Sequence, residues 1–151
     1  MTGGESGGDD PAGGERGARR VRVVVAEDNP GDVRLLEEAL AGLGRPLEVC
    51  PIADGLEVLR FVRREGPHAE RPVPDLFLLD LNLPKHDGRE ILVAIRASAD
   101  LARVPVVVLT SSGAPHDRRE LLRLGADRFV RKPCRLDELV AVGRVVAALL
   151  P

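Results

Sequence analysis

The sequence predicts an α/β fold in which a single parallel sheet is covered by helices on both faces. Five short apolar runs alternate along the chain with five stretches whose apolar residues recur at helical spacing. Strands and helices that alternate in this way form parallel βαβ units with right-handed crossovers. The apolar runs are also nearly continuous, which is typical of strands that are buried on both faces.

The predicted strands are recognised by their apolar content. The first contains one arginine among valine and alanine residues, and the second has a weaker pattern. The third and fourth are almost wholly apolar and are expected to be buried, and the fifth is a short run. The five strands are expected at residues 21–26, 47–52, 76–79, 104–109 and 128–131.

The first two helices have clear start signals. Asn29-Pro30 opens the first, because asparagine is a good N-cap and proline is favoured at the first helical position. Gly42 and Gly44 end this helix. Asp54 and Glu57 stand three residues apart, as in a capping box, and predict the start of the second helix. A proline-rich connection over 65–75 follows it.

The last three helices follow the third, fourth and fifth strands. Asp87-Gly88 opens one of them, and Gly125 ends the next, which is expected at 116–124. The final helix is expected at 136–150. With strand order 2-1-3-4-5 the whole arrangement is a flavodoxin-like, doubly wound, five-stranded parallel sheet with five helices.

Length and composition fit one domain with a sizeable core. The chain has 151 residues, of which 44% are hydrophobic and 30% charged. Residues 1–19 are rich in glycine and poor in large apolar residues, so we expect a disordered tail before a domain over 20–150. Cys50 and Cys134 make neither a disulfide framework nor a zinc cluster.

Several classes of partner and location are disfavoured. No apolar run approaches the roughly 18 residues of a membrane span, and no signal-peptide pattern opens the chain. We therefore expect a cytoplasmic protein without membrane insertion. The net charge of −2 matches the excess of acids in the tail, which leaves a neutral body. Without a basic stripe, tryptophan or tyrosine, direct binding of nucleic acid is not expected.

Polar residues follow four of the strands. Glu27 and Asp28 come after the first strand, Asp80 after the third, Thr110 after the fourth and Lys132 after the fifth. In strand order 2-1-3-4-5 the first and third strands are neighbours at the switch point, where ligands bind in such sheets. Three carboxylates, one hydroxyl and one ammonium are therefore expected in one crevice.

These groups suit a phosphoryl group held beside a metal ion. Three close carboxylates repel one another unless a cation lies among them, and oxygen ligands at a water-accessible site suit Mg²⁺. A carboxylate can act as the nucleophile while the ammonium and hydroxyl stabilise the phosphoryl oxygens. The chain has twenty arginines but only two lysines, Lys85 and Lys132. We therefore interpret Lys132 as a position that requires the compact charge of an ammonium group. Helix-terminal acids and turn residues are the simpler explanation of each residue alone.

Four stretches resemble the receiver domain of two-component response regulators. They are VVVAEDNP (23–30), LFLLDLNLPKHDG (76–88), VPVVVLTSS (104–112) and RFVRKP (128–133). The resemblance implies that Asp80 accepts a phosphoryl group from a sensor histidine kinase, so that the protein signals by contact and is no conventional enzyme, although it promotes its own phosphorylation and dephosphorylation. It also implies Mg²⁺ bound directly by Asp28 and Asp80, through water by Glu27, and by the backbone carbonyl of Asn82.

The same resemblance assigns further roles. It places Thr110 on a phosphoryl oxygen, Lys132 in an ion pair with the phosphate, and Phe129 at the position of the aromatic switch residue, with Thr110 as its partner. Four further stretches are similar to stand-alone receivers that partner phytochrome-type sensor kinases. They are EDNPGDVRLLEEAL, RREGPHAERPVPDL, DLNLP and KPCRLDEL.

Two other functions remain open. A pseudo-receiver would bind partners without phosphorylation, although such proteins usually lack one of the site residues and none is missing here. A phosphohydrolase of the haloacid dehalogenase type would need an acid two residues after Asp80, where this chain has Asn82.

The last helix also predicts a homodimer. Five residues are expected to face the sheet, and three more form a second apolar row that a partner would cover. We therefore expect association of two copies through the last two helices and the fifth strand. The first group is Leu136, Leu139, Val140, Val146 and Leu150, and the second is Val142, Val145 and Leu149.

Overall fold

The structure, a computed structural model, describes residues 20–111 and 115–151, with the side chains of residues 115–117 left out. The predicted tail at 1–19 and Ser112 lie outside the described residues, so the division into tail and domain stays a prediction. Within the described part, no helix is long and apolar enough to cross a membrane.

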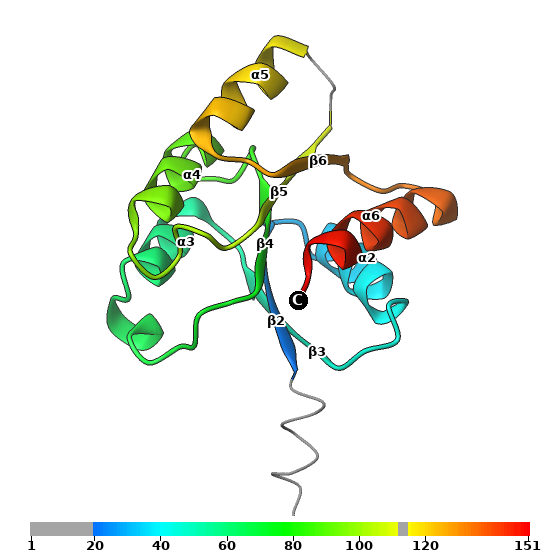
Figure 1. Cartoon of the computed structure of the whole chain (residues 1–151), viewed down its shortest axis with the longest axis horizontal. Coiled ribbons are helices and arrows are strands. Elements are labelled where there is room, and N and C mark those ends of the chain that lie inside the picture. Colours follow the sequence, from blue (N-terminus) through cyan, green and yellow to red (C-terminus); the bar gives the residue numbers. More distant parts are fainter. Residues whose placement is uncertain (1–19, 112–114) are drawn as a thin grey trace, which may run out of the picture.

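Five parallel strands form one sheet in the order β3-β2-β4-β5-β6 (Figure 1). Counted along the chain this is the predicted order 2-1-3-4-5, and the fold class is confirmed. The strands are β2 (Val21–Ala26), β3 (Leu47–Ile52), β4 (Leu76–Asp80), β5 (Val106–Thr110) and β6 (Arg128–Arg131).

Helices α3, α4 and α5 cover one face of the sheet, and α2 and α6 cover the other (Figure 1). Two apolar clusters result, one on each face, with the sheet between them. The helices are α2 (Pro30–Ala41), α3 (Gly55–Val62), α4 (Gly88–Ala97), α5 (Pro115–Leu124) and α6 (Leu136–Leu149).

Most predicted boundaries agree with the observed ones to within one residue, and two larger differences stand out. Strand β5 begins at Val106, two residues later than predicted, because the amide of Val104 closes a turn on the carbonyl of Leu101. The connection over 65–75 contains a short 3-10 helix, η1 (Gly66–His68), whose histidine is buried. Its Nε2 lies 3.1 Å from Oε1 of Glu57 on α3.

The face assignment of the last helix was right for Leu139, Val146 and Leu150, which pack in or against the core, and wrong for the others. Leu136 and Val140, predicted to face the sheet, are 77% and 48% exposed, whereas Val142 is fully buried. Val145 and Leu149, which belong to the predicted second row, pack against the core. Gly143 explains the rotation of α6: a Cβ there would lie 3.3 Å from the carbonyl oxygen of Ala39, so the helix turns its glycine side toward α2.

Asp54 caps α3, and half of the predicted capping box forms. Oδ1 of Asp54 accepts a hydrogen bond from the backbone amide of Glu57 at 2.8 Å. The carboxylate of Glu57 does not return to Asp54 but binds Arg60 and His68. The bond from the Glu57 amide is the main cause that holds the pKa of Asp54 below its usual value, and the ammonium of Lys85 adds to it.

Asp54→Ala is expected to lower the free energy of unfolding by about 1 kcal/mol at neutral pH, as for other lost N-caps. Because the folded-state pKa is depressed, this stabilisation exists above the unfolded value of 3.8 and disappears as pH falls through the folded-state pKa. Urea unfolding of wild type and variant at several pH values measures the difference. A cost that stays constant into strong acid would contradict the assignment.

Candidate functional site

Three carboxylates meet where β2 and β4 end. These strands are neighbours in the sheet, with Ala26 opposite Leu79, so Glu27, Asp28 and Asp80 leave the sheet at the same edge. One carboxylate oxygen from each lies within 4.8 Å of the others. Glu27 and Asp80 are each 1% exposed, and Asp28 is exposed. The structure thus brings together the three acids that the sequence singled out.

Lys132, directly after β6, places its ammonium between two of these acids. Its Nζ lies 2.9 Å from Oδ2 of Asp80 and 3.0 Å from Oε1 of Glu27. A fourth acid, Asp32 in the first turn of α2, lies 3.5 Å from the same nitrogen. Sequence reasoning missed Asp32, although its position in the first turn of a helix that starts beside Glu27 was a usable signal.

Lys85, the other lysine, does not join this group. It adopts a positive φ of 77° in the loop after β4 and pairs with Asp54 at 3.5 Å, with its side chain 60% exposed. Only Lys132 therefore meets the buried carboxylates, as the scarcity of lysine suggested.

Burial and neighbouring charges shift the pKa values of Glu27 and Lys132. The pKa of Glu27 is raised, mainly because the carboxylate is buried and also because Asp80 is close. The hydrogen bonds from Lys132 and from the backbone amide of Asn29 lower this pKa but do not cancel the increase. Burial lowers the pKa of Lys132, but its hydrogen bonds and charge interactions with Asp80 and Glu27 outweigh this and raise it. The ammonium thus stays protonated at physiological pH.

Backbone amides fix the orientation of the two buried carboxylates. The amide of Asn29 donates to Oε2 of Glu27 at 3.1 Å, and the amide of Asn82 donates to Oδ1 of Asp80 at 3.0 Å. The loop after Asp80 folds back tightly, so that Gly88 packs against the backbone of Leu81. A Cβ on Gly88 would lie 2.7 Å from Cα of Leu81, which leaves no room for a side chain there. Asn82 is therefore held beside Asp80, where its carbonyl was predicted to serve as a metal ligand.

Thr110 and Phe129 lie on β5 and β6. Asp80 is opposite Leu109 in the sheet, so Thr110 follows one residue later at the same edge, and its carbonyl accepts the amide of Lys132 at 3.0 Å. Phe129 is half-buried, and the guanidinium of Arg118 on α5 lies 5.8 Å from the centre of its ring. Both predicted switch residues thus lie on the two strands that follow β4 in the sheet.

The donor set fits a hard divalent cation. Within the part of the chain that the structure describes, Oε1 of Glu27 and Oδ2 of Asp80 are buried and meet only the Lys132 ammonium. One ammonium does not balance the carboxylates of Glu27, Asp28 and Asp80. Carboxylate oxygens beside a water-accessible opening, which Asp28 provides, are ligands that Mg²⁺ and Mn²⁺ accept.

Comparison with known proteins points to one family. A model of the response regulator receiver domain matches residues 23–144. Response regulator Rcp1 of Synechocystis is 38% identical over 117 residues, which are 78% of this chain and 80% of that protein.

Two solved structures are similar over most of their length. The phosphorylated cyanobacterial phytochrome response regulator RcpA has a TM-score of 0.78 and 38% identity, covering 87% of this chain and 94% of that one. The Mn²⁺-bound form of Rcp1 has a TM-score of 0.77 and 35% identity, covering 87% and 99%.

Proposed function

The chain belongs to the response regulator receiver family, a family of signalling proteins, and we propose that it accepts a phosphoryl group on Asp80. The observation that supports this most is the position of Asp80 at the end of β4. Its carboxylate is 1% exposed and lies 2.9 Å from the Lys132 ammonium. Glu27 and Asp28 stand beside it, which is the arrangement expected of an activated nucleophile next to a cation site.

The proposed transfer uses this chain's own groups as follows. An oxygen of Asp80 attacks the phosphorus of a phosphohistidine in a sensor kinase, the P–N bond breaks, and its electron pair stays with the histidine nitrogen. The amide of Asn82 holds the Asp80 carboxylate in place. The Lys132 ammonium and the Thr110 hydroxyl stabilise charge on the phosphoryl oxygens. A divalent ion, when bound, neutralises further charge on those oxygens.

The ion proposed here is Mg²⁺, held directly by Asp28, Asp80 and the carbonyl of Asn82, and through water by Glu27. The Mn²⁺-bound structure of Rcp1 supports a divalent ion in a protein of this kind. Asp28 is exposed, whereas Glu27 is already held by Lys132 and by the amide of Asn29. These contacts favour Asp28 as the direct ligand.

Asp28→Asn is therefore expected to weaken Mg²⁺ binding by about tenfold or more, and by more than Glu27→Gln does, because few protein ligands hold this ion. Calorimetric titration of Mg²⁺ into both variants and wild type measures the order. Glu38→Gln, an exposed acid on α2, is the matched control. Equal or reversed losses at Asp28 and Glu27 would contradict the proposed ligand set.

The site of phosphorylation can be mapped directly. The protein is incubated with acetyl phosphate and Mg²⁺, and intact mass spectrometry should find a gain of one phosphoryl group. Borohydride then reduces the aspartyl phosphate to homoserine, and peptide mapping should place this residue at position 80. A reduced residue at Asp28, Asp32 or elsewhere would refute the assignment.

The proposed kinase partner is a sensor histidine kinase of the phytochrome type. RcpA is described as a phytochrome response regulator, and the similarity to it supports this subgroup. Phosphotransfer from a set of purified kinases of the host would identify the partner, with the phytochrome-type kinase expected to react fastest. A cytoplasmic location is part of the same proposal.

The two alternative functions receive no support from a specific contact. A dehalogenase-type phosphohydrolase needs an acid at the position of Asn82. Here the backbone amide of Asn82 donates a hydrogen bond that orients Asp80. A pseudo-receiver usually lacks a site residue, whereas all of the predicted ones are present here.

The predicted homodimer through α5, β6 and α6 stays a prediction, and its residues need revision. Val145 packs against the core and does not belong to an exposed row. Among the described side chains of these elements, the large apolar residues that are exposed are Leu122, Leu136 and Val140.

A further inference from the structure

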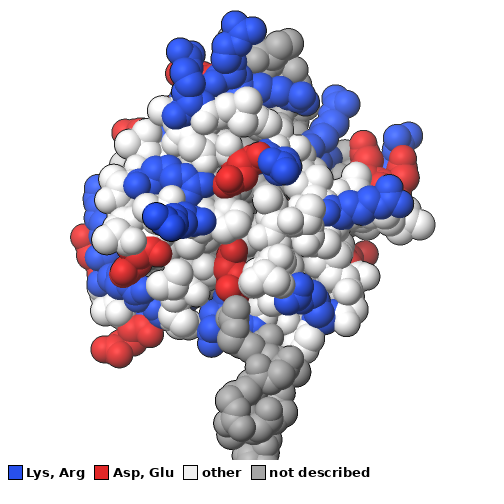
Figure 2. Space-filling view, in the orientation of Figure 1, with Lys and Arg blue, Asp and Glu red and all other residues white. Residues whose placement is uncertain are grey.

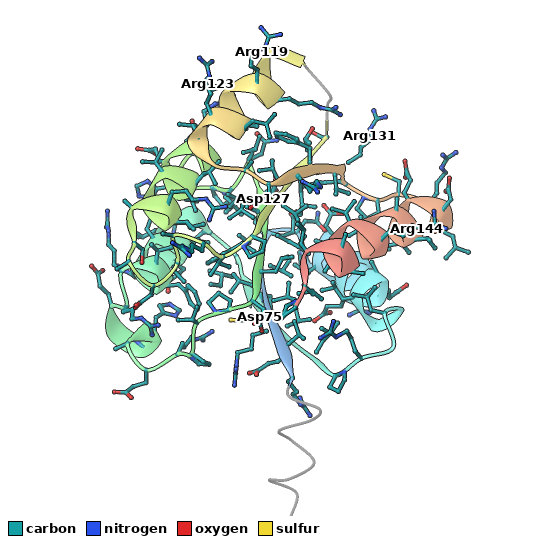
Figure 3. The ribbon with its side chains drawn as sticks, in the orientation of Figure 1. Asp75, Arg119, Arg123, Asp127, Arg131 and Arg144 are labelled. Carbon is teal, nitrogen blue, oxygen red and sulfur yellow. The ribbon has the colours of Figure 1, made fainter. Side chains whose placement is uncertain are left out.

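A cavity of about 370 Å³ is lined by residues of β2, β3, α3 and the segment that leads from η1 to β4. Arg22 of β2 and Pro74, just before Asp75, are among its lining residues, so it lies toward the end of the sheet where the strands begin. Asp75, labelled in Figure 3, accepts the backbone amide of Arg22 at 2.8 Å. Figure 2 shows basic side chains at the lower end of the molecule, where Figure 1 places the start of β2. The cavity shares no residue with the cluster of carboxylates at the other end of β2.

The charges at this cavity do not cancel. Arg22 and Glu48 are opposite each other in the sheet, and Nε of Arg22 lies 3.3 Å from Oε1 of Glu48. Arg71 is half-buried and has a weaker partner, because its guanidinium donates to Sγ of Cys50 and a thiol sulfur is a poor acceptor. Among the described residues, the Arg71 guanidinium has no acidic partner. One positive charge at the cavity is therefore left without a counter-charge.

The segment around Arg71 does not need this guanidinium to keep its conformation. The backbone amide of Arg71 donates to the carbonyl of His68 at 3.2 Å, and its backbone carbonyl accepts Nη1 of Arg64. Arg64 in turn pairs with Asp100 at 3.2 Å. The ring of His68 is buried edge-on against Phe61, with 5.7 Å between the ring centres. These contacts preform one side of the cavity, and they leave the charge of Arg71 without a structural explanation.

The uncompensated charge favours a ligand with a single negative charge. A guanidinium offers paired N–H donors that match the two oxygens of a carboxylate. A phosphate monoester carries about −1.5 to −2 charges at neutral pH, so it would bring excess negative charge close to Glu48. A monocarboxylate neutralises Arg71 without this excess.

The rest of the lining favours an apolar body of modest size. Phe61, Pro72 and Pro74 offer apolar surface in the same cavity as Arg71. The volume of about 370 Å³ lies in the lower part of the range of about 300–1,000 Å³ for small-molecule pockets. A small molecule with one carboxylate and a ring or short chain fits both features.

We propose that this cavity is a binding site for a small organic monocarboxylate with an apolar body. The carboxylate replaces the sulfur of Cys50 as the acceptor for the Arg71 guanidinium, and the apolar body lies against Phe61 and the two prolines. This inference goes beyond the phosphoryl transfer and does not depend on it, because the cavity and the carboxylate cluster are built from different residues.

Cys50 provides a built-in reporter, because its sulfur contacts the Arg71 guanidinium. The full chain is alkylated with iodoacetate, a monocarboxylate, and in parallel with the neutral iodoacetamide; in each case the thiolate displaces iodide and an S–C bond forms. Peptide mapping gives the rates at Cys50 and at the exposed Cys134. The ratio of the iodoacetate rate to the iodoacetamide rate should be about tenfold higher at Cys50 than at Cys134. If neither reagent reacts with Cys50 while Cys134 reacts, the cavity does not admit small anions and the proposal is refuted.

Variants at Arg71 test the source of this preference. Arg71→Gln removes the charge and should bring the ratio at Cys50 down to that at Cys134, whereas Arg71→Lys keeps the charge and should keep most of the preference. Arg34→Gln, at an exposed arginine of α2 on the other face of the sheet, is the matched control and should react like wild type. Equal ratios at Cys50 in wild type and Arg71→Gln, with both proteins folded by circular dichroism, would contradict Arg71 as the anchor.

Benzoate tests the apolar part of the proposed ligand. It should slow the reaction of Cys50 with iodoacetamide at lower concentrations than acetate does, because its ring covers Phe61 and the prolines. Benzyl alcohol has the ring without the charge and should protect less, and Arg71→Gln should weaken the protection by benzoate by about tenfold or more. Stronger protection by inorganic phosphate than by benzoate would overturn the proposal in favour of a phosphate site. Equal protection of Cys134 by benzoate would show a non-specific effect and would also refute the cavity as the site.

Discussion

Asp80→Asn is expected to abolish the phosphoryl mass gain that acetyl phosphate and Mg²⁺ produce in the wild-type protein. A carboxamide oxygen carries no full charge, so it is a far weaker nucleophile toward phosphorus. The substitution also removes a carboxylate that the proposed site offers to the metal ion. Since both the nucleophile and one ligand are lost, the expected effect is complete loss within the sensitivity of mass spectrometry.

Asp87→Asn is the matched control for this prediction. Asp87 lies in the same loop and caps α4 by accepting the amide of Arg89, and asparagine caps helices equally well. This variant should gain the phosphoryl mass like wild type. Undiminished labelling of Asp80→Asn, with both proteins folded by circular dichroism, would refute Asp80 as the acceptor.

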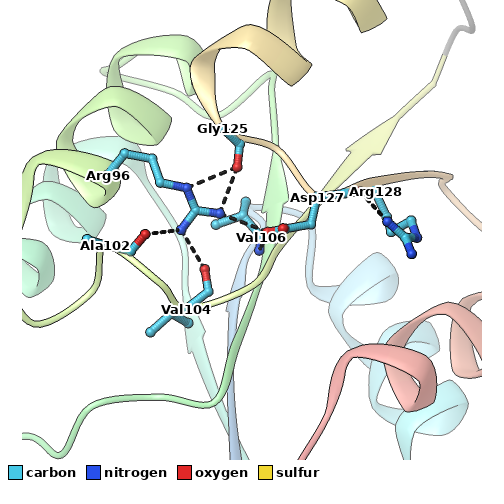
Figure 4. A network of polar contacts seen from close by, with 7 residues as sticks. All are labelled: Arg96, Ala102, Val104, Val106, Gly125, Asp127 and Arg128. Atoms are coloured by element: carbon cyan, nitrogen blue, oxygen red, sulfur yellow. Dashed lines mark hydrogen bonds and ion pairs between the residues drawn. The ribbon is translucent and has the colours of Figure 1, made fainter.

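Arg96→Met is expected to lower the free energy of unfolding by about 3 kcal/mol or more. The side chain of Arg96 is 21% exposed, and its guanidinium joins segments that precede β5 and β6 (Figure 4). It donates to the carbonyls of Ala102, Val104 and Gly125 and pairs with Asp127. Methionine keeps much of the apolar stem but leaves these carbonyls and the Asp127 carboxylate without their cation.

Arg63→Met provides the comparison for Arg96→Met, because Arg63 is an exposed arginine at the C-cap of α3 with no ion pair among the described residues. Its change in stability should stay within about 0.5 kcal/mol. Urea unfolding of the three proteins gives both differences. A loss below about 1 kcal/mol at Arg96 would show that water replaces the guanidinium without a large penalty.

The sheet and the cluster of acids could be predicted from the sequence, because both depend on short-range patterns and on strand order. Apolar runs and their alternation with helices define the strands, and strand order then places Glu27, Asp28 and Asp80 at one edge. Parallel strands that end together make this placement insensitive to errors of one or two residues. The start of β5, two residues later than predicted, leaves Thr110 at the same edge.

Features that depend on packing between distant segments could not be predicted in this way. Apolar spacing alone did not show which side of α6 faces the sheet, since Gly143 sets the rotation through contact with Ala39. Two of the Arg96 contacts join α4 to Gly125 and Asp127, which lie 29 and 31 residues later in the chain. Composition likewise gave a neutral body, whereas the structure separates the arginines of α5 from the acids that bind Arg89 and Arg96.

The proline in β3 has a consequence for behaviour at high concentration. β3 is the edge strand opposite β6, and Pro51 lies exposed within it, so the row of amide donors that another chain could use is interrupted. At the other edge, β6 has four residues and an arginine at each end. Both edges are thus poor templates for intermolecular β-structure. We therefore expect neither edge of the sheet to start aggregation when the protein is concentrated.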